Sequence, residues 1–282
     1  MDKLDRRKFL TNVGMFTAGA AAAATGIGVA TPDNAHSAEE PAQSTWPYVT
    51  LDIEDVRKRG HLGYYQAECA QGAFSAIVGS LQEKIGAPYT GVPLHLLAYG
   101  GGGVAGWCTL CGAVNGACAA ISLVAAKDDV KPLCDEMLKW YTQTAFPTDI
   151  SNEYATKHLY LVDKYKSDLA LPKSVPNSPL CHVNVSRWCK AHGYASGSSE
   201  RSERCARITG DVAAFAVDML NHLHMAKFEG KLAYGGEVDS CRACHKKGKD
   251  FAAGQWTRGK MECSGCHGLD TAKLVGPGHP ES

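Results

Sequence analysis

The chain has 282 residues, of which 45% are hydrophobic and 21% charged, and 29 basic side chains balance 29 acidic ones. This is the composition of a globular protein, so it excludes a disordered chain and a polytopic membrane protein. A nucleic-acid-binding protein is disfavoured as well, because it would need a basic excess. The unusual counts are 12 cysteines and 11 histidines, and they direct the functional interpretation.

Residues 1–38 predict an export signal. Arg6 and Arg7 precede an uncharged stretch, 11–32, that is rich in Ala, Gly and Thr, and 35–38 supplies small residues for a cleavage site. This pattern is typical of twin-arginine export to the periplasm. The alternative is a retained anchor, but Ala, Gly and Thr partition weakly into lipid. We therefore expect no membrane insertion of the mature chain.

Residues 39–229 predict a mostly α-helical, cysteine-rich domain. Apolar residues recur at helical spacing between breaks at Pro and Gly, and alternation of period two is almost absent. Asp128 or Asp129 is expected to cap the third helix. The expected helices span 62–85, 112–126, 128–147, 151–169, 183–192 and 201–228.

The composition changes after Gly230, where the chain becomes rich in Gly and Lys and poor in branched apolar residues. About 50 residues with so little to bury cannot form a core unless a covalent or metallic group supplies one. We therefore expect a domain boundary near Gly230, followed by a small, irregular segment over 230–282.

This segment contains the pattern Cys-x-x-Cys-His twice, at 241–245 and 263–267. The pattern is that of c-type haem attachment, in which two thiols bond the haem and the adjacent His ligates the iron. The four cysteines also have a zinc-ribbon spacing, but a ribbon has no use for His at the fifth position of both motifs. Two covalently bound haems c, close together, are therefore expected on Cys241, Cys244, His245, Cys263, Cys266 and His267.

Each haem iron needs a sixth ligand unless it keeps an open site. His222 and His224 stand at the end of the last long helix, and at spacing i, i+2 they point in different directions, so they could serve two different irons. The structural alternative is a pair of exposed histidines favoured by the helix dipole. Other candidates are His95, His182, His192, His279, Met219 and Met225.

Eight cysteines lie outside the haem motifs. In an exported protein they could pair as disulfides. Because twin-arginine export carries folded proteins, an iron-sulfur cluster inserted before export is the alternative, although no ferredoxin spacing is present. Cys118 and Cys134, on apolar helix faces, are most simply packed core thiols. The other six are Cys69, Cys108, Cys111, Cys181, Cys189 and Cys205.

Residues 111–116 match the Cys-Gly-Ala-x-x-Gly motif of a helical family to which redox activity is ascribed. That family has one earlier Cys, matched by Cys69, and two later ones, matched by Cys181 and Cys205. Followed by two haem motifs and preceded by an export signal, this module resembles the split-Soret cytochromes c over essentially the whole mature chain.

The resemblance implies a homodimer with two haems per chain near the subunit interface, each iron held by two histidines, one donated by the partner subunit. It also implies a non-haem iron centre, expected to be an iron-sulfur cluster, on Cys69, Cys111, Cys181 and Cys205. Cys108, Cys118 or Cys189 could replace one of these.

The expected function is electron transfer to and from redox partner proteins, with no catalytic residue. The alternative is an oxidoreductase that reduces a small molecule at an open haem iron or at the cluster. A high-spin haem, or one that binds carbon monoxide without ligand loss, would favour the enzyme.

Overall fold

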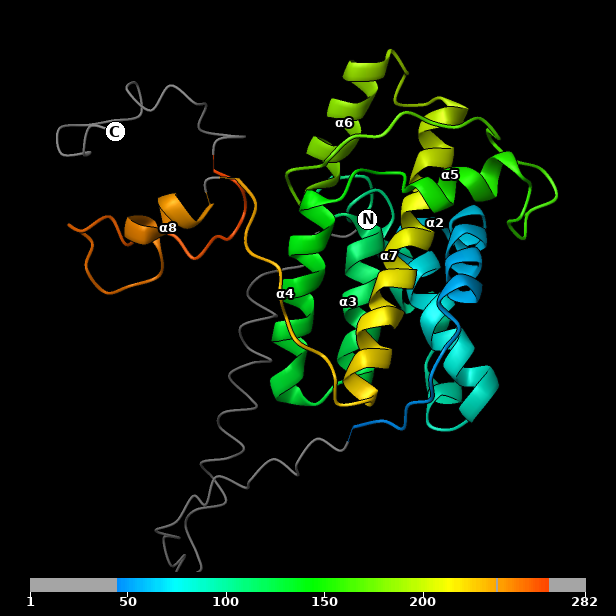
Figure 1. Ribbon diagram of the computed structural model, residues 1–282, viewed down its shortest axis with the longest axis horizontal. Coiled ribbons are helices and arrows are strands. Elements are labelled where there is room, and N and C mark those ends of the chain that lie inside the picture. Colours follow the sequence, from blue (N-terminus) through cyan, green and yellow to red (C-terminus); the bar gives the residue numbers. More distant parts are fainter. Residues whose placement is uncertain (1–44, 237, 264–282) are drawn as a thin grey trace, which may run out of the picture. The chain divides into compact units, whose positions relative to one another are not determined.

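The computed structural model describes residues 45–236 and 238–263 (Figure 1). Within these residues it contains helices and two short 3₁₀ turns, and pairing of β type is limited to isolated bridges. The predicted mostly α fold is confirmed. The elements are α2 (Ile53–Ile85), η1 (Tyr89–Gly91), η2 (Leu94–Gly100), α3 (Gly112–Val124), α4 (Lys127–Gln143), α5 (Asp149–Thr156), α6 (Cys181–His192), α7 (Ser199–His224) and α8 (Val238–His245).

Helix α7 packs along α2 and α3, and α3 also packs against α4 (Figure 1). The core between them is apolar: Ile77 of α2, Ile121 of α3 and Val212 of α7 are fully buried. Burying a side chain of this size contributes about 1.5–3 kcal/mol. The nearly all-apolar α3 matches its predicted range to within two residues at its end, because it is buried on most of its surface.

Helix α2 begins at Ile53, nine residues before the predicted start, because the Asp52 side chain caps it by accepting a hydrogen bond of 2.8 Å from the Asp55 amide. The helix is broken at Ala67 and Glu68, and Glu68 has a φ of 62°. This break turns the chain immediately before Cys69.

Two further predictions were wrong, one on the end of a helix and one on a helix cap. The helix predicted over 151–169 ends at Thr156 in α5, and His158 then adopts a φ of 55°, which a continuing helix cannot contain. Asp128 and Asp129 lie inside the first turn of α4, after Ala126, so they do not cap it. Their charges still favour a helix N-terminus.

Beyond α7 the described chain is irregular except for α8. Residues 1–38 and the last four residues of the second haem motif, Cys266 and His267 among them, lie outside the described residues. In the part that is described, no helix is long and apolar enough to cross a membrane. The boundary near Gly230 stays a prediction.

Candidate redox centres

Backbone hydrogen bonds hold three cysteines of the helical domain together. The Cys111 amide donates to the Pro179 carbonyl at 2.9 Å, and the Cys181 amide donates to the Thr109 carbonyl at 2.7 Å. The His182 amide donates to the Cys108 carbonyl at 3.0 Å. The loop before α3 is thereby fastened to the first turn of α6, which brings Cys108, Cys111 and Cys181 to one end of these helices.

Glycines of α3 bring Cys69 to the same place. A Cβ on Gly112 would collide with the Cys69 sulfur, and a Cβ on Gly116 would collide with the Ala70 carbonyl. Gly112 and Gly116 are four residues apart and therefore share one face of α3. The glycines of the Cys-Gly-Ala-x-x-Gly stretch thus allow α3 to approach the broken segment of α2 that carries Cys69.

Burial and the neighbouring thiols raise the pKa of three of these cysteines. Burial, together with the neighbouring Cys111 and Cys205, raises the pKa of Cys69 to about 12. Burial also raises the pKa of Cys181, and Cys111 and Cys205 again contribute. The pKa of Cys111 is raised in the same way by burial, with a further increase from Cys205. The four predicted ligands, Cys69, Cys111, Cys181 and Cys205, therefore lie within each other's electrostatic reach.

Helix N-termini face these sulfur atoms. Cys111 is the N-cap of α3, where the nearby backbone amides of Val114 and Ala113 lower the pKa of its thiol against the larger effect of burial, and Cys181 is the first residue of α6. Amides at a helix start and the positive end of its dipole stabilise a thiolate. The site is therefore suited to anionic sulfur, although burial raises the pKa of Cys69, Cys111 and Cys181 in the metal-free chain.

Among the described residues, no group of three His, Cys, Asp or Glu side chains is placed so that it could hold a metal ion as it stands. The soft sulfur donors, their burial and the helix N-termini fit a thiolate-bound iron-sulfur group.

The remaining cysteines of the helical domain divide into two groups. Cys108 lies within the electrostatic reach of Cys181, and Cys189 within that of Cys205, so both border the site. Cys118 of α3 and Cys134 of α4 hydrogen-bond to each other and pack against the core. These two are the packed core thiols that the sequence predicts.

Helix α8 carries the first haem motif. Cys241, Cys244 and His245 lie within one turn, at spacing i, i+3 and i+4, so they share a helix face. The His245 Nδ1 atom lies 3.0 Å from the Gly254 carbonyl oxygen and must therefore carry the ring proton, because a carbonyl only accepts. In the neutral ring the lone pair is then on Nε2, the nitrogen available to an iron.

The first cysteines of the two haem motifs are in contact. Burial raises the pKa of Cys263, and its hydrogen bond with Cys241 raises it further. The start of the second motif therefore lies beside the first.

His222 and His224 are both exposed at the end of α7. The His222 Nδ1 atom donates to the Asp218 carbonyl at 2.7 Å, and the His224 ring meets the edge of Tyr48 with centroids 5.5 Å apart. Their imidazoles thus leave the helix toward different neighbours.

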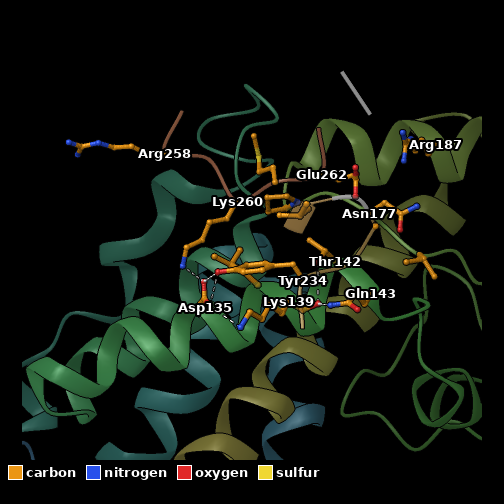
Figure 2. Close-up of a pocket in the computed structure, with 17 residues that line it drawn as sticks. Asp135, Lys139, Thr142, Gln143, Asn177, Arg187, Tyr234, Arg258, Lys260 and Glu262 are labelled. Carbon is orange, nitrogen blue, oxygen red and sulfur yellow. Dashed lines mark hydrogen bonds and ion pairs between the residues drawn. The ribbon is translucent and has the colours of Figure 1, made fainter. Parts of the chain in front are cut away.

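A cavity of about 770 Å³ lies between α4 and the segments around Tyr234 and Lys260 (Figure 2). Lys260 and Lys139 pair with Asp135 at 2.6 and 3.0 Å, and the Nζ atoms of both lie over the Tyr234 ring. The haem-motif residues that the structure describes do not line this cavity, so it is not assigned to a haem.

Comparisons with known proteins agree with this geometry. The family model described as "Putative redox-active protein (C_GCAxxG_C_C)" matches residues 67–219. Its label places Gly before Cys, whereas this chain has Cys111 before Gly112, so the two residues stand in opposite order. The helical domain therefore defines a cysteine-rich protein of a redox-active class.

A curated relative, the split-Soret cytochrome c of Desulfovibrio desulfuricans, is 36% identical over 79% of this chain and 77% of its own length. A solved structure, described as "A novel iron centre in the split-Soret cytochrome c from Desulfovibrio desulfuricans ATCC 27774", matches with a TM-score of 0.68 and 34% identity, covering 83% of this chain and 95% of the other. The chain belongs to the split-Soret cytochrome c family, a family of redox proteins.

Proposed function

We propose that this protein is a periplasmic dihaem c-type cytochrome that transfers electrons and also holds a non-haem iron-sulfur centre. The observation that carries the proposal is the single turn of α8 that presents two thiols and an imidazole on one face. The proposed export by the twin-arginine signal in 1–38 agrees with haem attachment outside the cytoplasm.

Cys241 and Cys244 would bond one haem and His245 would ligate its iron, while Cys263, Cys266 and His267 would hold the second haem. When bound, the haems and the iron centre supply one-electron transfer. The chain orients the His245 ring through Gly254, where a Cβ would come within 2.9 Å of the His245 Nδ1 atom. Glycine at this position therefore lets the carbonyl reach the ring.

We further propose a homodimer in which His222 and His224 serve as sixth ligands, each for an iron of the partner subunit. Their exposure supports this assignment, because an imidazole at the surface can reach a second chain. With His on both sides of each iron, no coordination position is left for a substrate. The protein then carries electrons and does not catalyse a reaction on a small molecule.

The non-haem centre is proposed on Cys69, Cys111, Cys181 and Cys205. The relative's "novel iron centre" supports a non-haem iron site in this family. The convergence of these four thiols from α2, α3, α6 and α7 supports the residue assignment.

Anaerobic purification with optical and EPR spectra and assays of haem, iron and acid-labile sulfide tests the proposal. We expect two low-spin haems per chain and additional iron with sulfide. Replacement of Cys205 by Ser is expected to remove most of the non-haem iron and leave the haems in place. Replacement of Cys118 by Ser is the matched control and should retain both.

Three results would contradict the proposal. A colourless protein with the mass of the bare polypeptide would exclude the haems and favour a zinc site. Absence of acid-labile sulfide would exclude the iron-sulfur centre. A high-spin haem that binds carbon monoxide without ligand loss would favour the oxidoreductase.

A further inference from the structure

Arg204, on α7, is a buried cation without a complete set of partners. Its side chain is 0% exposed. Its Nη2 atom donates to the Asn184 side-chain oxygen at 2.7 Å and to the Ser174 hydroxyl at 3.3 Å. Its Nε and Nη1 atoms have no hydrogen-bond partner within the described chain. Buried N–H groups are very rarely left unpaired in native proteins, so these two call for an explanation.

Arg207, one turn further along α7, shows how this fold normally accommodates a buried guanidinium. It is also 0% exposed, but its Nε atom pairs with Glu203 at 3.1 Å. Its remaining nitrogens donate to the Asn152 side chain and to the carbonyls of Ser167 and Leu169 at 2.7–2.8 Å. Arg204 forms no such ion pair with a carboxylate in the part of the chain that is described. Its counter-charge must come from another group.

The surroundings of Arg204 identify that group. Its guanidinium lies within the electrostatic reach of Cys205, Cys111 and Cys189, whose sulfur atoms act as its negative neighbours when ionised. The guanidinium also lies over the Trp188 ring, with its carbon 5.1 Å from the ring centroid. The cysteine site therefore provides the anionic surface that Arg204 lacks.

A chain of donors runs from Arg204 to the same sulfur atoms. Arg204 donates to the Asn184 oxygen, and the Asn184 amide donates to the Tyr141 hydroxyl at 2.5 Å. The Tyr141 hydroxyl in turn bonds the Cys111 sulfur and lowers the pKa of that thiol against the larger opposing effect of burial. Every donor in this chain points toward Cys111, which stabilises negative charge on its sulfur.

We propose that Arg204 is the buried counter-charge of the non-haem iron centre, and that its Nε and Nη1 atoms donate hydrogen bonds to the sulfur atoms of that centre. The inference rests on the proposed function and adds a positioning residue outside the four cysteines. A fixed positive charge beside a thiolate-bound cluster stabilises its reduced form, which carries one more electron. Arg204 therefore raises the reduction potential of the centre.

The test is an EPR-monitored redox titration of the purified holoprotein and of its Arg204→Met and Arg204→Lys variants. At a fixed ambient potential, Arg204→Met is expected to lower the reduced-to-oxidised ratio of the non-haem centre at least tenfold, a fall of 59 mV for a one-electron couple. Arg204→Lys keeps the charge and should lie between Arg204→Met and the wild type. The haem signals are the internal control, and their ratios should not change.

A second measurement covers a variant that fails to hold the centre. Thermal unfolding of the iron-depleted full chain should show that Arg204→Met is at least as stable as the wild type, because the variant removes an unpaired buried charge. In the loaded protein the wild type should be the more stable of the two. Loss of the centre together with a destabilised iron-depleted chain would assign Arg204 a purely structural role and overturn the proposal.

An unchanged potential in a fully loaded Arg204→Met protein would also overturn it. Absence of any non-haem centre from the wild type is a different result, because it contradicts the proposed function itself.

Discussion

His61 of α2 and Glu203 of α7 form a buried pair whose charge state depends on pH. His61 is fully buried, donates from Nε2 to Glu203 at 2.9 Å, and stacks on Tyr160 with ring centroids 3.7 Å apart. Burial lowers the pKa of His61, although Glu203 partly opposes this shift. Burial alone would raise the pKa of Glu203, but His61, Tyr65 and Arg207 together bring it below its usual value. Both groups are therefore harder to protonate in the folded chain than in the unfolded one.

Acid should destabilise the fold through His61. A group with a depressed folded pKa contributes stability above its unfolded pKa, and this stability is lost as the pH falls toward the folded pKa. For His61 the loss of folding stability begins below about pH 6.5, the ordinary pKa of histidine, and amounts to about 1.4 kcal/mol per pH unit. Thermal unfolding between pH 7.5 and 5 should show a falling Tm, and His61→Gln should flatten the slope. His158→Gln, at an exposed histidine, is the control, and an equal effect of both variants would contradict the prediction.

At the scale of elements, close packing at glycines holds the two halves of the broken helix α2 together next to Cys69. Gly63 and Gly72 lie on either side of the break in α2, and a Cβ on Gly63 would meet the Gly72 backbone at 2.7 Å, while one on Gly72 would meet the Gly63 backbone at 2.8 Å. Gly100 packs against Ala70 in the same region. Only residues without side chains allow three chain segments to come this close, so glycine there is a packing requirement.

Gly116→Ala should therefore disturb both stability and the proposed iron site. The added methyl would collide with the Ala70 carbonyl, and overpacking of this kind costs about 1–3 kcal/mol. Gly79→Ala is the matched control in α2, because its methyl would lie 3.8 Å from Leu94, an ordinary contact. We expect the control to be unchanged or slightly more stable. Urea unfolding with iron analysis measures both effects, and equal behaviour of the two variants would argue against close packing at Gly116.

At the scale of the whole molecule, the two proposed kinds of redox centre occupy different parts of the chain. The thiol site is built from α2, α3, α6 and α7, whereas the haem motifs follow α7 in a segment whose described part contains only α8 as regular structure. Glu136 of α4 links the helical domain to this segment, because it accepts hydrogen bonds from the amides of Lys231 and Leu232 at 2.9 and 3.0 Å. These hydrogen bonds run from backbone amides to a carboxylate and do not involve the thiols.

Loss of one haem should consequently leave the non-haem centre in place. A protein with both Cys241→Ala and Cys244→Ala is expected to lose about half of its haem absorbance, because only one of the two motifs is removed. Non-haem iron and acid-labile sulfide per chain should stay at wild-type values. Haem and iron assays on the same preparation test this, and a joint loss of haem and sulfide would show that the centres depend on each other.

The sequence by itself determined the helical class, the position of the first haem motif and most of α3, α6 and α7. These features depend on residues a few positions apart, so periodicity and spacing are sufficient. The break in α2 and the early end of α5 could not be predicted from the sequence, because both depend on unusual backbone conformations at single residues.

Only the tertiary structure brought Cys69, Cys111, Cys181 and Cys205 together and placed an unpaired Arg204 beside them. Nothing in their spacing predicts this, and their selection from the sequence rested on resemblance to a family. The physical reason is that contacts between distant segments depend on how whole helices pack and on which face each helix turns toward its neighbours.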